Sequence, residues 1–315
     1  MDFTARLFRP ADDLIPLVEL HNAVEEAEGR PATLTLERMR SALDAPHLYR
    51  WVVALPGKGA ATADAPEGWL AGYGVLYQQH AERCYGDVKV HPEWRRRGIG
   101  KELTAALVDK VVELRTRYLA IDVDHTNQDA IRFLLTQGFR FRGDTWALIA
   151  PAELDLPMPE WPAGYSVKPY VEIHDLPLMV ALSNRTFGDL WGHWENTPGL
   201  VDEARMTETL GYYDPQGVFV VFDSTGAAVA HCRALAATDG ESPHILDQPG
   251  VVTECRDEGL HVPLALTAAH WLRAGGDRPI RLESWGDSRE TIAAYEALGF
   301  KLADHQVSYV RVLGL

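Results

Sequence analysis

The sequence predicts a mixed α/β fold that occurs twice along the chain. Segments with helical spacing alternate with short apolar segments typical of strands, a proline-rich stretch divides the chain near its middle, and residues recur at a constant offset. Of the 315 residues, 46% are hydrophobic and 24% are charged. This composition is typical of a globular protein, and the length suggests about two domains.

A stretch rich in proline separates the two halves. Four prolines fall within residues 151–164, and because proline neither continues a helix nor donates to a sheet, we expect a stiff linker there. This predicts domains over residues 1–150 and 165–315. Across the linker, Gly98 recurs as Gly259, 161 residues later. Two further pairs share this offset, Ile15-Pro16-Leu17 with Leu176-Pro177-Leu178 and Gly138-Phe139 with Gly299-Phe300. We interpret the halves as copies of one domain.

The elements of the first half follow from local patterns. Helices are predicted where apolar residues recur every three or four positions, and strands where aromatic and β-branched residues cluster. Gly138 is placed to end a helix. The predicted helices are Asp12–Val24, Leu34–Leu43, Gly98–Arg115 and Asn127–Gln137, and the predicted strands are Tyr49–Leu55, Trp69–Tyr77, Cys84–Val90, Tyr118–Val123 and Phe139–Ile149.

The second half repeats much of this order. Its predicted strands are Val218–Phe222, Ala227–Leu235, Val251–Val252, Ile280–Ser284 and Val307–Val312, and its predicted helices are Leu260–Arg273 and Glu290–Leu298. Each copy is therefore expected to be a central mixed sheet flanked by helices.

Charge separates the halves. Residues 1–150 carry 19 basic and 21 acidic side chains, whereas residues 151–315 carry 11 and 24. The net charge of −15 argues against binding to nucleic acid, which requires a basic face. An anionic ligand is expected to favour the first half and a cationic ligand the second.

Several classes of protein are not expected. No apolar run is long enough for a membrane span, and the first residues lack the pattern of a secretory signal. The three cysteines form no CxxC pair, and the histidines show no metal-ligand spacing. We expect a reduced, cytoplasmic protein without a bound metal. A homodimer remains one alternative for its assembly.

The segment after Val90 is predicted to bind phosphate. A strand ends near Pro92 and a helix begins near Gly98, so unpaired helix N–H groups meet a ligand there. Glycines allow the backbone to approach the ligand closely, and basic side chains add positive charge. These residues are Arg95, Arg96, Arg97, Gly98, Ile99, Gly100 and Lys101. Their arrangement is typical of a diphosphate site.

This segment resembles the GCN5-related N-acetyltransferases (GNAT). Their signature, Arg/Gln-x-x-Gly-x-Gly/Ala after a strand ending in Val-x-Pro, is matched by Arg95 to Gly100 after Val90-x-Pro92. A second signature follows, with Ile121-x-Val123, Asn127-x-x-Ala130 and Gly138-Phe139. The resemblance implies tandem GNAT folds, each with two splayed parallel strands.

The resemblance also implies acetyl-CoA as co-substrate. Backbone groups along Val88, Lys89 and Val90 would pair with the pantetheine arm. The amides of Arg95 to Gly100 would hold the pyrophosphate beside Lys101, and Asn127 would contact the cofactor arm.

The reaction implied is attack of an amine on the thioester, which requires removal of a proton. The family often uses an acidic residue on the fourth strand, so Asp87 and Glu82 are the candidate bases. Water, His91 or a group from the other half are alternatives.

The acid that protonates the leaving thiolate is commonly a tyrosine four residues before Gly-Phe. That position is Leu134 in the first half and Tyr295 in the second. Tyr77 and Tyr85 are possible substitutes in the first half, although packing is the alternative role for each. Tyr295 either packs in the core or lines a shared site.

The second copy departs from the cofactor pattern. It has Asp257 and Glu258 near the expected pyrophosphate, His261 in place of the second glycine, and Ser288 in place of Asn127. Like charges repel and the imidazole occupies space, so we expect no acetyl-CoA there. The layout is similar to that of tandem, mycothiol synthase-like GNAT proteins, in which one copy is catalytic and the other shapes the substrate cleft.

These observations predict acetylation of a small, cationic primary amine by the first domain, with the second domain shaping the acceptor site. An aminoglycoside, a polyamine or an amino-acid derivative would suit an acidic, aromatic pocket, for which the candidates are Trp191, His193, Trp194, Glu195, Trp271 and Trp285. Core packing is the alternative role for the tryptophans. The alternative functions are a non-catalytic acyl-CoA-binding or scaffolding protein, and an acyltransferase with another acyl donor or a protein N-terminus as acceptor.

Overall fold

The computed structural model describes residues 3–43, 46–55, 69–80, 83–190, 201–239, 242–285 and 287–314. The chain forms two compact units. Unit 1 comprises Met1–Phe141 with Ser308–Leu315, and unit 2 comprises Arg142–Val307. None of the described helices is long and apolar enough to cross a bilayer.

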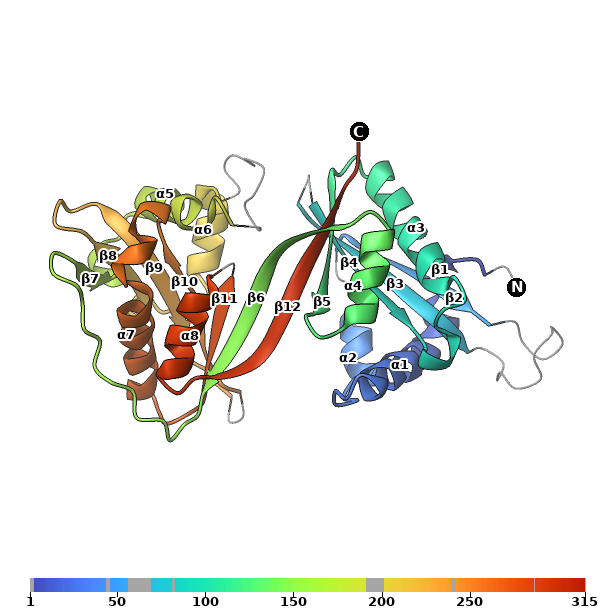
Figure 1. Cartoon of the computed structure of the whole chain (residues 1–315), viewed down its shortest axis with the longest axis horizontal. Coiled ribbons are helices and arrows are strands. Elements are labelled where there is room, and N and C mark those ends of the chain that lie inside the picture. Colours follow the sequence, from blue (N-terminus) through green and yellow to red (C-terminus); the bar gives the residue numbers. More distant parts are fainter. Residues whose placement is uncertain are drawn as a thin grey trace. The chain divides into compact units, whose positions relative to one another are not determined.

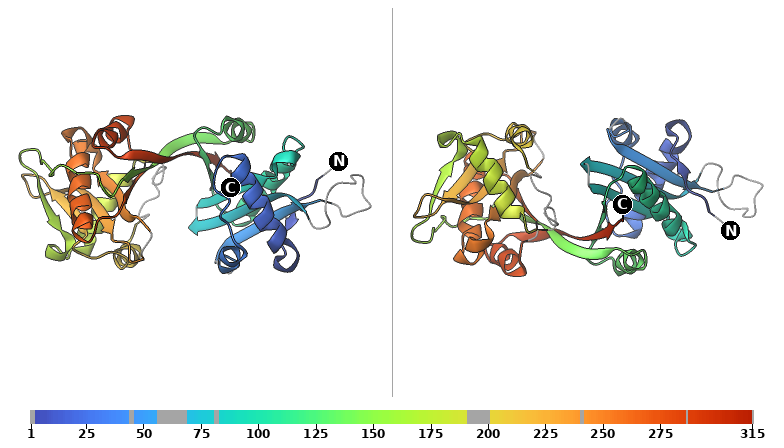
Figure 2. Two further views of the ribbon diagram at one scale, coloured as in Figure 1. Left: turned by 90° about the horizontal axis from the view of Figure 1, so that it is seen from below. Right: turned by 90° about the horizontal axis from the view of Figure 1, so that it is seen from above.

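Unit 1 is a mixed sheet with helices on both faces (Figures 1 and 2). Its strands follow the order β1-β2-β3-β4-β5-β12. All registers that are defined among β1 to β4 are antiparallel, and β4 and β5 are parallel. The elements are β1 (Arg6–Leu7), α1 (Pro10–Ala27), α2 (Leu36–Ser41), β2 (Leu48–Ala54), β3 (Leu70–His80), β4 (Arg83–Val90), the 3₁₀ turn η1 (Pro92–Trp94), α3 (Ile99–Glu113), β5 (Tyr118–Asp124), α4 (Gln128–Thr136) and the C-terminal part of β12 (Lys301–Val312).

Unit 2 repeats this plan, with the strand order β6-β11-β10-β9-β8-β7. Here β10 and β11 are the parallel pair. The elements are β6 (Arg140–Ala150), β7 (Ser166–Pro169), η2 (Tyr170–Glu172), α5 (Leu176–Phe187), α6 (Glu203–Leu210), β8 (Val218–Phe222), β9 (Ala228–Leu235), β10 (His244–Val251), η3 (Thr253–Glu258), α7 (His261–Ala274), β11 (Ile280–Trp285) and α8 (Arg289–Ala297).

The two copies exchange their last strands. β6, the last strand of the first copy, pairs with β11 of unit 2 in antiparallel register, Ile280 opposite Ala150. The end of β12, the last strand of the second copy, lies beside β5 of unit 1, where Leu313 N donates to Arg117 O (2.9 Å). Each sheet therefore needs a strand from the other half of the sequence.

The compact units differ from the domain boundaries predicted at residues 150 and 165. Unit 2 begins at Arg142 because β6 belongs to its sheet. The proline-rich segment lies inside unit 2 and packs there: Leu156 is buried, and Arg273 donates to the carbonyl oxygens of Pro151 and Ala152. Residues 151–164 contain no helix or strand, and they follow the exchanged strand within unit 2.

The mixed fold and nearly all predicted elements are present, within a few residues at their ends. The predicted strand Val251–Val252 is only the end of the longer β10, and Val252 lies just beyond it. Among the described residues, the α-helices and strands that were not predicted are β1, β7, α5 and α6, and the three 3₁₀ turns η1, η2 and η3 were not predicted either. The strands β1 and β7 are short, and α6 is a helix of eight residues with a mostly polar sequence.

Candidate functional site

The parallel strands β4 and β5 separate partway along their length, as the splayed arrangement predicts. They pair only from Arg83 with Tyr118 to Tyr85 with Ala120, whereas β4 continues to Val90. On its other side β4 stays paired with β3 to its end. In the described part of the chain, the backbone of residues 86–90 thus makes no ladder pair with β5, and this edge includes the predicted contacts at Val88, Lys89 and Val90.

The turn after β4 leads into the N-terminus of α3. Gly98 is the N-cap in the left-handed region (φ 90°), which L side chains rarely adopt, and a Cβ there would meet no atom within 4 Å. No backbone partner is found among the described residues for the amides of Arg96, Arg97 and Gly98. These amides and the helix dipole make an anion-binding turn.

The side chains of the predicted cofactor loop divide into two groups. Ile99 is buried, and Arg97 stacks over the Trp94 ring, 4.5 Å from its centroid. Arg96 and Lys101 are exposed. A Cβ at Gly100 would contact the Phe133 ring at 3.4 Å, so this glycine keeps α3 close to α4. The loop therefore combines a packed inner side with a basic outer surface.

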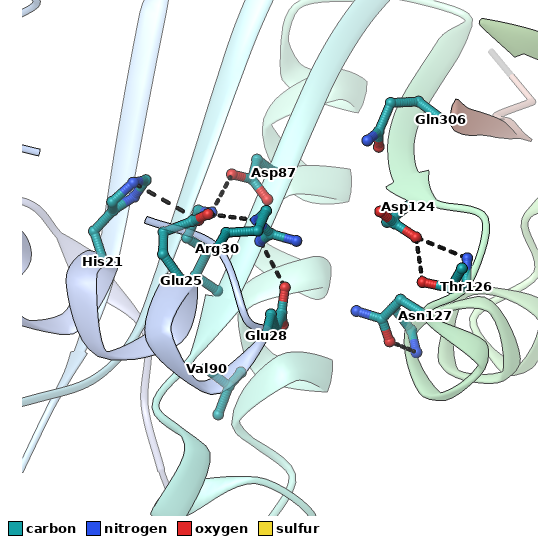
Figure 3. A network of polar contacts seen from close by, with 12 residues as sticks. His21, Glu25, Glu28, Arg30, Asp87, Val90, Asp124, Thr126, Asn127 and Gln306 are labelled. Atoms are coloured by element: carbon teal, nitrogen blue, oxygen red, sulfur yellow. Dashed lines mark hydrogen bonds and ion pairs between the residues drawn. The ribbon is translucent and has the colours of Figure 1, made fainter. Parts of the chain in front are cut away.

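Two of the basic residues predicted to bind the cofactor are held by acidic side chains. Lys89 Nζ lies 2.6 Å from Glu25 Oε1, and Arg95 Nη2 lies 2.9 Å from Glu28 Oε1. Arg30 joins both carboxylates, so five residues form one chain of ion pairs between α1, β4 and the turn. Figure 3 shows Glu25, Arg30 and Glu28 of this chain. Arg95 also donates to Val90 O (3.2 Å). The side chains of Lys89 and Arg95 therefore position the turn, and the backbone groups of these residues are the part that faces a ligand.

Glu25 is the centre of this chain. Hydrogen bonds from Arg30 and Lys89 outweigh its loss of hydration and lower the pKa of its carboxyl from 4.5 to about 2. His21 lies one turn earlier on α1, with Nε2 3.7 Å from Glu25 Oε1. Burial and the charge of Lys89 lower the pKa of its imidazole. His21 is thus a neutral base candidate that the sequence analysis missed.

Asp87, the first predicted base, lies on β4 just beyond the last pair with β5, and its side chain is exposed. Its Oδ2 is 3.9 Å from Lys89 Nζ. Glu82, the second, lies outside the described residues. His91, the alternative, accepts a hydrogen bond from the Glu93 amide and lies against the Trp69 ring, and burial lowers its pKa.

Asn127 is the N-cap of α4. Its Oδ1 accepts from Ala130 N (3.1 Å), and the neighbouring Asp124 accepts from Thr126 (Figure 3). The side-chain amide nitrogen of Asn127 makes no recorded bond within the described residues. The family pattern Asn-x-x-Ala is therefore a helix cap whose free NH₂ group remains available to a cofactor.

A second carboxylate lies where the two strands separate. Asp122 lies on β5, and its Oδ1 accepts a hydrogen bond from Ser308 Oγ on β12. Partial loss of hydration raises the pKa of this carboxyl, and the charge of Asp87 adds to the effect. The sequence analysis missed Asp122 because its partner lies 186 residues away. No local pattern could have revealed this pair.

Leu134, where the family has its tyrosine, is buried in α4. Tyr85 is partly buried, and loss of hydration raises its pKa to about 12. Tyr77 is exposed. A thiol of pKa about 8.5 leaves readily as a thiolate, so a strong acid is not required.

Unit 2 has a different site at the equivalent place. A cavity of about 230 Å³ is lined by Arg256, Asp257, His261, Asp287 and Ser288, among others. His261 Nε2 lies 3.6 Å from Asp287 Oδ1, and burial lowers the pKa of the imidazole and raises that of the carboxyl. Arg256 forms an ion pair with Asp189 (2.6 Å). The two residues are as far apart in the sequence as Arg95 and Glu28, which form the corresponding ion pair in unit 1.

These side chains fit a pyrophosphate poorly. His261 stands where Gly100 stands in unit 1, the basic Arg256 is already paired, and Asp257 adds negative charge. Among the described residues, no three His, Cys, Asp or Glu side chains gather in a way suited to a metal ion.

Tyr295 is fully buried on α8, packed near Phe300 in the core of unit 2. Its hydroxyl has no hydrogen-bond partner among the described residues, and burial raises its pKa. Trp271 packs on the backbone at Gly217. The predicted pocket residues Trp191, His193, Trp194 and Glu195 lie outside the described residues.

Comparison with known proteins gives concordant results. The model of the acetyltransferase (GNAT) family matches residues 17–139. A mycothiol acetyltransferase of Pseudarthrobacter chlorophenolicus is 27% identical over 303 residues, covering 92% of this chain and 90% of that protein. The mycothiol acetyltransferase of Saccharopolyspora erythraea is 26% identical over 286 residues, covering 87% and 93%.

Solved structures show the same fold. A GCN5-related N-acetyltransferase from Sphaerobacter thermophilus superposes with a TM-score of 0.73 at 20% identity, covering 99% of this chain and 97% of that one. A tandem GNAT protein from the clavulanic acid biosynthesis pathway gives a TM-score of 0.59 at 20% identity, covering 100% and 99%.

Proposed function

We propose that this chain is a tandem-domain acetyltransferase of the GNAT family that uses acetyl-CoA, as its similarity to the family model and to mycothiol acetyltransferases supports, and that unit 1 transfers the acetyl group to the primary amine of a small, cationic molecule. The observation that carries this assignment is the joint presence, in unit 1, of the free β4 edge and the glycine turn at α3. Unit 2 has His261 and Asp257 in the corresponding places.

The residues of unit 1 suit acetyl-CoA. The amides from Arg95 to Gly100 would bind the pyrophosphate, the edge of β4 at Val88 and Val90 would pair with the pantetheine arm, and the Asn127 amide would contact that arm. Acetyl-CoA supplies an activated thioester when bound. The ion pairs at Glu25 hold the turn and β4 in place before the ligand arrives.

The chain itself has to bind the amine and accept its proton, since an alkyl ammonium with a pKa near 10 is mostly protonated at pH 7. Asp87 is exposed beside the free edge of β4. We propose it as a group that attracts the ammonium. The expectation that the C-terminal half shapes the acceptor site belongs to this proposal.

A panel of amines tests the function. Purified protein is incubated with acetyl-CoA and polyamines, aminoglycosides or amino-acid derivatives, and release of the thiol is followed. Turnover on at least one small amine is expected. Tight binding of acetyl-CoA without turnover on any amine would instead identify a non-catalytic acyl-CoA-binding protein, which the missing tyrosine at Leu134 favours. Faster reaction with a longer acyl donor or a peptide N-terminus would indicate the other alternative.

A matched pair of variants tests which unit binds acetyl-CoA. Gly98→Glu and Gly259→Glu place the same side chain at equivalent left-handed positions, and in both a Cβ would meet no atom within 4 Å. The backbone strain is therefore similar, about 1–2 kcal/mol. Gly98→Glu is expected to abolish CoA binding in calorimetry through charge repulsion. Gly259→Glu is expected to leave one CoA per chain, and loss of binding there would overturn the assignment to unit 1.

A further inference from the structure

The two strands that separate in unit 1 bring two carboxylates to the same face of the sheet. The last pair of β4 with β5 is Tyr85 with Ala120. Because side chains alternate along a strand, Asp87 and Asp122, each two residues further on, emerge on the same face as Tyr85. The charge of Asp87 acts on the carboxyl of Asp122. Asp87 is exposed, and Asp122 reaches solvent but is partly covered at its bond to Ser308, so a substrate can reach both residues.

The second copy of the domain contributes a residue to this place. Ser308 lies on β12, is fully buried, and donates its hydroxyl hydrogen to Asp122 Oδ1. The bond from Leu313 N to Arg117 O and the bond from Ser308 to Asp122 lie five residues apart on each strand and in opposite directions, as in an antiparallel pairing of β12 with β5. One oxygen of Asp122 is therefore fixed, and Oδ2 has no partner among the described residues.

Unit 2 lacks this arrangement. The equivalent of Asp122 is Glu283, and the residue opposite it on β6 is Ala147, which has no hydroxyl. Glu283 instead accepts a bond from Arg281 Nε (3.0 Å) on its own strand. The serine–aspartate pair thus occurs in the unit that has the intact glycine turn.

We propose that Asp122 is the general base of unit 1 and that Ser308 is the residue that positions it. This inference rests on the proposed function and adds a catalytic residue to it. The Asp122 carboxylate takes one proton from the acceptor ammonium. The freed amine forms a bond to the thioester carbonyl carbon, the carbon–sulfur bond breaks, and the nitrogen gives its second proton to the departing thiolate, so that the amide and the thiol are released. The first proton then passes from Asp122 to water, which restores the carboxylate.

The surroundings of Asp122 suit this role. Loss of hydration and the nearby Asp87 raise the pKa of the carboxyl, which makes it a stronger base, while the bond from Ser308 opposes the rise. Asp87 and Tyr85 on β4 and Ser308 on β12 face this carboxyl. Asp87 attracts the ammonium, and the Ser308 hydroxyl donates to Asp122.

The test uses the full-length protein with an amine that the wild type acetylates. Asp122→Asn is expected to lower kcat by about 10²-fold or more with an unchanged Kd for acetyl-CoA. Asp129→Asn, an exposed carboxylate on α4, is the control and is expected to keep the wild-type kcat. A kcat for Asp122→Asn within twofold of the wild type would overturn the inference and leave the proposed function intact.

Ser308 is tested through the pH profile of kcat. Ser308→Ala removes the bond that favours the ionised carboxyl, so the acidic limb of the profile is expected to move to higher pH. Ser308→Thr keeps a hydroxyl and is expected to restore the limb. An unmoved limb in Ser308→Ala with normal CoA binding would overturn the positioning role. Failure of the wild type to acetylate any amine would overturn the proposed function and this inference with it.

Discussion

A single carboxylate, Glu25, connects the helix α1 to the strand and turn that would bind acetyl-CoA. It accepts hydrogen bonds from Arg30 and Lys89, at 2.5 and 2.6 Å. Its side chain is mostly buried, so these bonds are little weakened by solvent. The local consequence is a lowered pKa, and the consequence for folding is a stability that depends on pH.

The sign of that dependence follows from the direction of the shift. Glu25 has a folded pKa of about 2 against 4.5 for the ordinary group, so its stabilisation is complete above pH 4.5 and declines as the pH falls through 2. Glu25→Gln is expected to destabilise unit 1 at neutral pH, and the difference from wild type is expected to shrink by about 1 kcal/mol between pH 5 and 3.5. Urea unfolding of both proteins at each pH measures this.

The control is Glu19→Gln, an exposed carboxylate on the same helix with no ion pair recorded in the described part of the chain. Its unfolding free energy is expected to stay close to that of the wild type. A pH-independent effect of Glu25→Gln would contradict the ion-pair explanation.

At the scale of elements, glycines on β3 and β4 determine how closely α3 approaches the sheet. A Cβ at Gly72 would lie 2.6 Å from Ile99 Cγ2 and 2.8 Å from Leu103 Cδ1, and one at Gly86 would lie 2.8 Å from Leu107 Cδ2. Such distances are not found for real Cβ atoms. The missing side chains thus allow the N-terminus of α3 to lie next to the end of β4.

Gly72→Ala is expected to move the start of α3 away from β4, because its Cβ would press on the first residue of the helix. We expect a loss of about 1–3 kcal/mol in unfolding free energy together with weaker CoA binding. Gly74→Ala is the matched control, since its nearest contact is Leu107 in the middle of α3 at 2.9 Å. A similar loss of stability with nearly normal CoA affinity is expected there, and equal affinities in the two variants would contradict the argument.

At the scale of the whole molecule, the exchange of last strands makes each unit depend on both halves of the sequence. Unit 1 lacks its outer strand beside β5 unless residues 308–315 are present. An unpaired strand exposes backbone donors and acceptors, which costs stability and promotes aggregation. An early stop codon therefore affects the unit at the other end of the chain.

Removal of residues 308–315 is expected to disrupt unit 1 and its CoA binding while unit 2 stays folded. Hydrogen exchange followed by peptide mass spectrometry separates the two units. Removal of residues 314 and 315 alone retains the bond from Leu313 to Arg117 and is expected to have little effect. Normal protection of β5 in the longer deletion would show that the strand exchange is unnecessary.

Much of the fold was predictable because its signals are local. Helix periodicity, apolar strands and the requirement for glycine at left-handed positions such as Gly98 and Gly138 are written in neighbouring residues. The same holds for the turn before α3. The boundary at residue 150 was less accurate because strand pairing partners are chosen by distant residues, here β11 for β6.

The sequence by itself determined that one domain plan occurs twice and that only the first copy keeps the turn suited to a pyrophosphate. These properties depend on residue type and short spacing. Only the tertiary structure decided which copy completes which sheet, and so brought Ser308 to Asp122. Contacts between residues so far apart depend on the packing of the whole sheet, and no short segment contains the information that selects them.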